Sequence, residues 1–476
     1  MAITRRTTFQ AAPVQAVTSQ NYLDIQNNGW AQQYLPDLIE AEAEVYGKRT
    51  ISGFLSQVGA EEAMSADQVI WSEQGRLHLS YTCDMLDVTA STINITNDID
   101  GVAQTTTHGI RVGDQVLIAG GGQTVTARVS VAAAGSQTIT VQPYRFAHMT
   151  NAGFVNGDNT CTILVFGSEN AKGVSYVGGR SNEPSFTTFT NKPIILKDMY
   201  EVSGSDAAQV GWVEVTGEEG QNGYYWYLKA EGDTRARFTD YLEMSMIESE
   251  LVAAASAIAL PTDGGAGTAG TEGLFAAVRS RGHQTSGVTG VSPLVDFAEF
   301  DAILAEFDRN GAIEENMMFV NRATSLAMDD MLASMNSYGA GGTSYGVFDN
   351  SEDMALNLGF SGFRRGSYDF YKSDFRYLND LATRGGINAA AGSAAIRGVI
   401  VPAGTSSVYD QTVGQSIRRP FLHVRFRASA TDDRRMKTWV TGSVGAATSA
   451  LDAMQMHYLT ERCLITQGAN NFMLMK

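Results

Sequence analysis

The stretch DTRARFTDYLEMSMIESELVAAASAIA, residues 233–259, decides the fold of this chain. Asp233 and Thr234 supply an N-cap, and the helical pattern continues until Pro261 and the glycines after it forbid a helix. At about 100° per residue, two sides separate: Phe238, Tyr241, Leu242 and Val252 on one, and Asp240, Glu243 and Glu250 on the other. About 27 helical residues span about 40 Å, which exceeds the width of most single cores. The pattern therefore predicts a spine for something larger than one globule.

Composition limits the class of protein. The chain has 476 residues, is 43% apolar and has a net charge of −17, which predicts two to four domains and argues against coating nucleic acid or an anionic membrane. No run of 18 apolar residues occurs and the N-terminus lacks an apolar signal segment, so we expect a protein made and used in solution. The three cysteines lie far apart without CxxC spacing, which favours structural thiols in a reducing compartment.

Strand and turn patterns dominate the two hundred residues before the predicted spine. Short β runs over 87–168, with hairpin signals at Gly120-Gly121-Gly122 and Gly135-Ser136, predict a small barrel or sandwich. Alternating segments at 66–86 and 169–222 flank it and predict a long β hairpin into which this domain is inserted.

An α/β pattern follows the predicted spine. Asp296-x-x-Glu299 predicts a capping box for a helix that ends at Asn310-Gly311, and residues 317–320 predict a buried strand. A methionine stripe at 328–335 indicates a core-facing helix or an adaptable binding face. The tail predicts strands at 421–426, 454–460 and 462–465.

No motif for catalysis or cofactor binding stands out. The glycine-rich turns lack the Lys-Ser/Thr ending of a phosphate loop, the six histidines show no HxxxH or HxH pairing, and no GxSxG occurs. Most carboxylates fall on predicted solvated helix faces or caps. The sequence therefore predicts no catalytic, cofactor-binding or metal-binding residues.

One basic concentration stands out in this acidic chain, formed by Arg418, Arg419, Arg425, Arg427, Arg434, Arg435 and Lys437. Arg425 and Arg427 share a strand face with His423, which is consistent with an ordinary solvated strand. The alternative is that these arginines meet acidic helices of a neighbouring subunit, with Asp240 and Glu243 as candidates, or face DNA. Subunit contacts are favoured over DNA.

The order of predicted elements is an arm, a long β hairpin, a spine helix, an α/β region and a β tail. This order resembles the Hong Kong 97 fold of major capsid proteins of tailed bacteriophages. Residues 316–326, NMMFVNRATSL, are similar to the strand and helix of that family's axial domain, and 362–373 followed by 399–404 to its next strands. Residues 457–469, HYLTERCLITQGA, are similar to its closing peripheral strand. Residues 87–168 depart from the family as an insertion, of a kind that crAss-like podoviruses carry.

The resemblance implies an α+β fold with defined parts. These are an N-terminal arm (1–65), an extended β loop (66–86 and 169–222), an inserted β domain (87–168), a peripheral domain with spine helix and β tail (223–290 and 403–476) and an axial α/β domain (291–402).

The resemblance also implies a function. Many copies would form hexamers and pentamers of an icosahedral head around double-stranded DNA, which the protein would contact non-specifically at most. Expected partners are a portal and auxiliary or cement proteins, with no cofactor and no membrane. Assembly is expected in the bacterial cytoplasm and the final location in the virion. The competing classes are a tail-fibre or adhesin module, suggested by the β content, and a hydrolase or glycosidase, which would need a paired acid and base.

Overall fold

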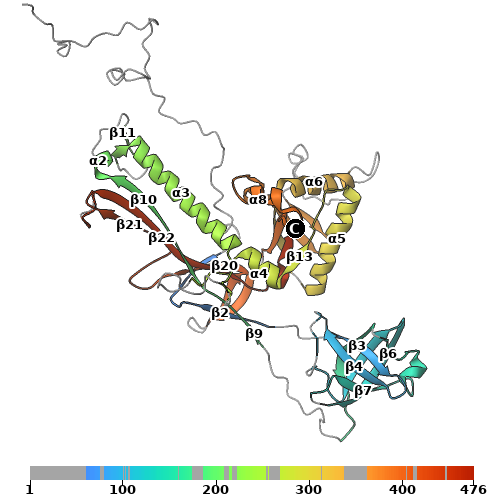
Figure 1. Cartoon of the computed structure of the whole chain (residues 1–476). Helices are drawn as coiled ribbons and strands as arrows, with labels where there is room; N and C mark the ends of the chain where they lie inside the picture. Colours follow the sequence, from blue (N-terminus) through green and yellow to red (C-terminus); the bar gives the residue numbers. More distant parts are fainter. Residues whose placement is uncertain are drawn as a thin grey trace, which may run out of the picture. The chain divides into compact units, whose positions relative to one another are not determined.

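The computed structural model describes residues 60–74, 80–99, 101, 103–104, 108–133, 135–158, 160–173, 186–207, 214–216, 222–253, 256, 268–311, 313–336, 362–403, 405–410, 415–444 and 448–476. The predicted arm, residues 1–65, therefore lies outside the description up to residue 59. The described residues form a five-stranded sheet, a six-stranded sheet, a closed barrel and three two-stranded ribbons (Figure 1). With the helices, this makes a mixed α and β fold.

The five-stranded sheet combines strands that lie far apart in the sequence. Its members are β1 (Ala60–Met64), β10 (Ile194–Ser203), β20 (Leu422–Arg427), β21 (Lys437–Gly442) and β22 (Ala453–Thr466). β22 pairs antiparallel with β10 along one edge and with β21 and β20 in succession along the other. β1 adds in parallel to β20. The two strands predicted at 454–460 and 462–465 are one strand of 14 residues.

Helix α3 (Tyr225–Glu248) is the predicted spine, with different ends. It begins eight residues before the predicted start at 233, and the Thr234 hydroxyl donates to the Ala230 carbonyl, 2.8 Å away, so Thr234 lies inside the helix and is no N-cap. α3 runs beside β10 and β22 (Figure 1). The ring centroids of Phe238 and Tyr458 lie 5.9 Å apart, so the apolar side of the helix packs on the β tail of the same chain.

The spine ends at Glu248, well before the predicted end at residue 259. The reason lies in helix α4 (Leu274–Arg281), which begins directly after Gly273 against the end of α3. A Cβ atom at Gly273 would lie 2.8 Å from the Ser249 carbonyl oxygen and 2.9 Å from that of Ile247. This close approach closes the end of α3, and Leu251 then pairs with Gly270 instead of continuing the helix.

The six-stranded sheet has helices on both faces. Its order is β13 (His283–Thr285), β23 (Met473–Met475), β17 (Gly398–Pro402), β14 (Glu315–Val320), β16 (Tyr368–Asp374) and β15 (Gly362–Arg365). Met318 and Val320 pack with helices α5 (Pro293–Asn310) and α6 (Arg322–Asn336). Phe319, on the other face, shares a core with α4 and with Leu464 of β22. β13 and β23 come from segments that the sequence placed in the peripheral domain, so the predicted boundaries at 291 and 403 do not separate the two sheets.

The predicted capping box of α5 is wrong. The helix begins at Pro293 behind Ser292, whose side chain accepts from the Val295 amide. Asp296 accepts instead from the Gly290 amide at 2.8 Å, and Glu299 from the Thr289 amide at 2.8 Å. Both carboxylates therefore hold the loop before the helix. The predicted end at Gly311, which has φ 63°, is confirmed.

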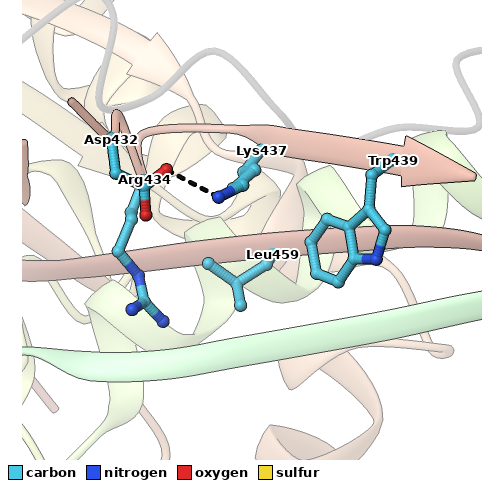
Figure 2. A pocket seen from close by; sticks show the side chains of 5 residues that line it. All are labelled: Asp432, Arg434, Lys437, Trp439 and Leu459. Atoms are coloured by element: carbon cyan, nitrogen blue, oxygen red, sulfur yellow. Dashed lines mark hydrogen bonds and ion pairs between the residues drawn. The ribbon is translucent and has the colours of Figure 1, made fainter.

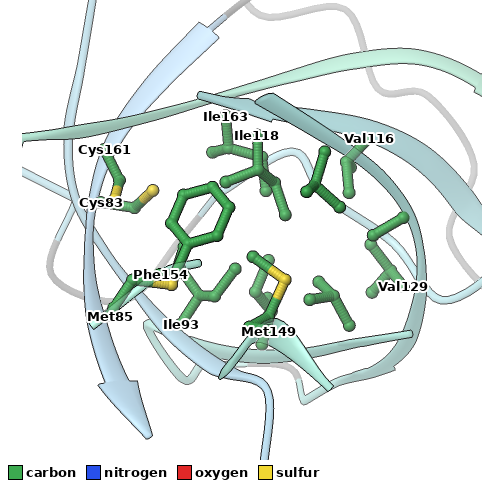
Figure 3. Close-up of a cluster of buried hydrophobic side chains, with 14 of the residues drawn as sticks. Cys83, Met85, Ile93, Val116, Ile118, Val129, Met149, Phe154, Cys161 and Ile163 are labelled. Carbon is green, nitrogen blue, oxygen red and sulfur yellow. The ribbon is translucent and has the colours of Figure 1, made fainter. Parts of the chain in front are cut away.

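A closed barrel occupies the region of the predicted insertion. Its order is β3 (Ser80–Asp87), β4 (Thr92–Asp98), β7 (Thr138–Pro143), β6 (Gln123–Ala132), β5 (Asp114–Gly120) and β8 (Cys161–Ser168). Inward side chains from every strand fill its interior, and Phe154 and Met149 from the connection before β8 pack among them (Figure 3). The hairpin between β5 and β6 turns at Gly121 and Gly122, with φ 55° and 79°, as predicted. β3 belongs to the barrel, whereas the sequence placed residues 80–86 in the extended loop.

The extended loop is shorter than predicted. β2 (Val69–Gln74) pairs antiparallel with β9 (Phe186–Asn191). β10, expected as part of the returning limb, belongs to the five-stranded sheet instead.

The remaining elements are α2 (Gly204–Ala207), β11 (Glu214–Thr216) paired with β12 (Asn222–Tyr224), β18 (Thr405–Asp410) paired with β19 (Gln415–Pro420), α7 (Arg376–Asn379), α8 (Arg384–Ala391) and three 3-10 turns at Met149–Ala152, Gly392–Ala394 and Ala469–Asn471.

Candidate functional site

The predicted basic residues of the tail form a charged cluster within the five-stranded sheet. Arg425 and Arg427 lie on β20 between β1 and β22, and His423 on the same strand is 1% exposed. The solvated strand face that the sequence suggested is therefore wrong. β20 alternates apolar and polar residues, which is typical of a strand with one face in water, but pairing with a neighbouring strand on each edge buries it.

β1 binds this cluster through two consecutive glutamates. Side chains alternate along a strand, so Glu61 and Glu62 reach opposite faces of the sheet. A carboxylate oxygen of Glu62 lies 3.0 Å from the Arg425 guanidinium. On the face covered by α3, Glu61 pairs with Arg435 and lies 3.2 Å from Arg462. The edge strand is thus held by charge on both of its faces.

Arg462 is the most buried member of the cluster, with a side chain that is 6% exposed. Burial lowers its pKa, and the nearby Glu61 carboxylate opposes that change. Its other nitrogens donate to the Arg435 carbonyl at 2.7 Å and to the Thr460 hydroxyl at 3.0 Å. A buried guanidinium is stable only when its donors are satisfied in this way. Arg462 was missed among the site residues, although it stands in the closing strand that the resemblance singled out.

Glu243 of α3 also belongs to this buried group. It is 6% exposed and acts electrostatically on Arg462, whereas the sequence placed it on the wet side of the spine. Asp240 is half-buried, and Tyr241, expected on the apolar side, is 50% exposed. The predicted helix face was therefore rotated, although Phe238 and Leu242 are buried as expected.

The opposite face of the sheet carries the rest of the cluster. Glu461 is contacted by Arg434 at 2.9 Å and by Arg427 at 3.4 Å. Arg427 also pairs with Asp67, and this hydrogen bond raises the pKa of Arg427 and lowers that of Asp67. Arg425, Arg427, Arg434 and Arg435 therefore have carboxylate partners in their own chain. Their predicted contacts to a neighbouring subunit stay a prediction. Arg418 and Arg419 lie on β19, and their side chains fall outside the description.

The base of the β2–β9 ribbon is anchored beside this cluster. Trp71 is 8% exposed and packs with Cys463 and Ile465 of β22. The guanidinium of Arg281, at the end of α4, lies 4.5 Å from the Phe189 ring centroid. The apolar side of the ribbon base therefore rests on its own chain, and not on an adjacent subunit, as would be expected of a two-stranded ribbon that is marginal alone in water.

Asn191 joins the ribbon to the body of the molecule. It is 1% exposed, and its amide donates to the Leu464 carbonyl at 2.6 Å and to the Glu272 carbonyl at 3.0 Å. Its oxygen accepts from the Glu272 amide at 2.8 Å. One asparagine thereby fixes β9, β22 and the start of α4 relative to one another.

Metal-ligand groups and cysteine thiols can be assessed among the described residues. They contain no group of three His, Cys, Asp or Glu side chains that could hold a metal ion. Burial raises the pKa of the Cys161 and Cys463 thiols to about 12, and the pKa of Cys83 is raised by burial as well. Such thiols are protonated at neutral pH and are poor nucleophiles. Within the same described ranges, no helix has both the length and the apolar character needed to cross a membrane.

Comparison with known proteins gives weak similarities. No protein-family model and no curated protein matches the chain. A solved structure from Mycobacterium phage Ogopogo is 9% identical, with 95% of this chain and 98% of that chain covered and a TM-score of 0.41. The capsid of a native GTA particle is 10% identical, with 95% and 98% covered and a TM-score of 0.37. The mature capsid of bacteriophage PhiM1 is 9% identical, with 64% and 78% covered and a TM-score of 0.31. At such values, the function has to be argued from this chain itself.

Proposed function

We propose that this chain is a major capsid protein of a tailed bacteriophage. The observation that carries the proposal is that α3 lies along a sheet whose strands both precede and follow the helix in the sequence. β10 precedes α3, and β20, β21 and β22 follow it. The interrupted ribbon β2–β9 comes before this unit and the strands β14 to β17 of the six-stranded sheet come between its halves. This is the element order on which the sequence resemblance rests.

Exposed apolar side chains support a protein that works as an assembly. Val291 and Leu294, at the start of α5, are 74% and 82% exposed, and Leu381, just after α7, is 78% exposed. Single exposed apolar residues are common, but large ones at these exposures are costly to leave in water and mark contact surfaces when they gather. A closed symmetric shell supplies neighbours that cover them.

In finer detail, we propose hexamers and pentamers in an icosahedral head that encloses double-stranded DNA. A chain with a net charge of −17 has little general attraction for phosphate, so DNA would be contacted non-specifically at most. A portal and auxiliary or cement proteins are the proposed partners. The role is structural, the assembly site is the host cytoplasm and the destination is the virion. The barrel is the feature on which assignment to crAss-like podoviruses would rest.

Electron microscopy of the purified full-length protein tests the proposal. Closed shells of uniform diameter are expected, whereas an adhesin or fibre module would give elongated trimers and a hydrolase would give small particles. Leu294→Asp should remove assembly with little effect on the monomer, because Leu294 is exposed. Leu294→Met, which keeps an apolar surface, is the matched control. A wild-type protein that forms no shells under any assembly condition would overturn the proposal.

A further inference from the structure

Within the part of the chain that the structure describes, helix α3 covers one face of the five-stranded sheet and no helix covers the other. Asp198 of β10 and Tyr458 of β22 are register partners, and both face α3, through Arg237 at 2.9 Å and through Phe238. Neighbouring residues along each strand point to the opposite side. The register therefore defines two rows on the open face. The rows are Met199, His457 and Trp439, and next to them Lys197, Leu459 and Lys437, each crossing β10, β22 and β21 in that order.

The open face is hollowed where these rows meet the charged cluster. Asp432, Arg434, Lys437, Trp439 and Leu459 line a cavity of about 280 Å³ (Figure 2). Leu459 is 6% exposed and forms its floor, while the indole of Trp439 stands at one end and the guanidinium of Arg434 at the other. Trp439 is held in place by His457, whose ring stacks on it with centroids 5.1 Å apart.

Apolar and basic groups surround this cavity. Ile195 and Met199 on β10 are 51% and 46% exposed, although both stand on a sheet face. Lys197 is exposed and has no ion partner among the described residues. Lys437 pairs with Asp432 at 2.6 Å, but both side chains stay more than 40% exposed. The surface thus offers an apolar floor between two accessible ammonium groups.

The balance of charge favours a protein over DNA. Glu201, Asp432 and Glu461 stand on this face together with the two lysines and Arg434, so the face has no large positive excess. Binding to a phosphate backbone needs such an excess. An acidic protein surface with an apolar centre matches better, because single lysines at the rim steer and align an acidic partner. A second copy of this chain, with a net charge of −17, is an acidic partner of this kind.

We infer that the open face of β10, β22 and β21 is a contact surface between copies of this chain. The cavity takes an apolar side chain of the second copy, and a carboxylate beside that side chain pairs with Lys437 or Lys197. The inference deepens the proposed function and rests on it, since it names a surface by which the subunits of a shell associate.

Charge reversal on the full-length protein tests the inference. Lys197→Glu combined with Lys437→Glu should raise the protein concentration needed for assembly by about tenfold or more. Met199→Glu, at an exposed position in the same rows, should act in the same direction. Lys192→Glu, an exposed lysine in the turn before β10, is the matched control and should assemble like the wild type. The urea unfolding midpoint of each unassembled variant should equal that of the wild type.

Amine labelling of the wild type gives a second readout. Acetylation of Lys197 and Lys437 should fall severalfold in assembled particles relative to unassembled protein, as measured by mass spectrometry. Equal labelling of both lysines in the two states would overturn the inference, and so would charge-reversal variants that assemble normally. In either case, shells formed by the wild type would still support the capsid proposal. A wild type that stays monomeric would overturn both. Loss of binding to labelled duplex DNA in the double variant, with self-association unchanged, would assign the face to DNA instead.

Discussion

The barrel and the five-stranded sheet are both β structures, yet they are built in opposite ways. All six barrel strands lie between Ser80 and Ser168, and nineteen of the described residues form its apolar core. The sheet joins strands as distant as β1 and β22, and the contact between Arg462 and Glu61 spans 401 residues. A cluster of arginines and glutamates occupies the middle of the sheet.

This difference indicates that different interactions stabilise the two regions. A barrel closed by sequence-local antiparallel pairs needs only its own apolar core, so it should unfold as a unit of its own. The sheet depends on long-range pairing and on charges that are satisfied only when every strand is present. The following experiments separate the two regions, and each could show them to be coupled.

The largest effect is expected in the barrel core. Phe154 is 3% exposed there, and Phe154→Ala should lower the stability of the barrel by about 3–5 kcal/mol through lost burial and a cavity. Differential scanning calorimetry should show one transition shifted and the transition of the sheets unchanged. Val155→Ala, at the next and 63% exposed position, should change stability by about 0.5 kcal/mol or less. Equal shifts of both transitions would show that the barrel is not independent.

The converse experiment concerns α3. Leu242 is 5% exposed between α3 and its sheet, and Leu242→Ala should cost about 2–5 kcal/mol in the transition of the sheet alone. Tyr241→Ala, on the exposed side of the same helix, is the control and should cost less than about 1 kcal/mol. Denaturant titration with separate probes in the barrel and the sheet measures both. A negligible loss at Leu242 would mean that another face of α3 carries the packing.

Sequence reasoning succeeded where local pattern decides the structure. The hairpin at Gly121 and Gly122 could be predicted because a two-residue turn requires positive φ, which two adjacent glycines adopt readily. The long helix and the burial of its Phe238 and Leu242 follow from apolar periodicity. The end of α3 could not be predicted, because it depends on the fit of Gly273 against the helix terminus.

The charged cluster shows the limit of such reasoning. The sequence indicates an unusual basic group at Arg425 and Arg427 and suggests partners in other subunits, whereas in the structure both pair with carboxylates of their own chain. Glu61 and Glu62, in the segment that the sequence assigns to the N-terminal arm, supply part of the charge. Nothing in AEEAM, the sequence of β1, indicates a strand, since its pairing with β20 is parallel and distant in sequence. The rotated face of α3 has the same cause, because the buried Glu243 acts electrostatically on Arg462, which is distant in sequence.

A smaller effect is expected from one carboxylate of β1. Glu61→Gln keeps the shape of the side chain but leaves the buried guanidinium of Arg462 without its nearest negative charge. The sheet should lose about 1–3 kcal/mol, and the barrel should be unaffected. Glu250→Gln, in an exposed ion pair with Arg279 at 3.5 Å, should cost about 0.5 kcal/mol or less. Isothermal urea unfolding compares the two variants. Equal losses would show that the cluster contributes no more than a surface ion pair.

The smallest effect concerns Asp67, the exposed partner of Arg427. The hydrogen bond from Arg427 lowers the pKa of Asp67 below its ordinary value of 3.8. A carboxyl group with a lowered pKa binds fewer protons in the folded state than in the unfolded state, so the contact stabilises the fold above the ordinary pKa and is lost as the pH falls through the lowered one. Asp67→Asn should therefore lower the urea midpoint of the sheet slightly at about pH 7, and the difference from the wild type should shrink between about pH 4 and about pH 2. Asp330→Asn, at an exposed position on α6, controls for the loss of a negative charge in an acidic chain. The barrel midpoint should be the same in both variants, because Asp67 pairs with Arg427 of β20 in the five-stranded sheet. A difference that grows as the pH falls would mean that Asp67 destabilises the fold when it is ionised. The side chains around β20 would then carry more negative than positive charge.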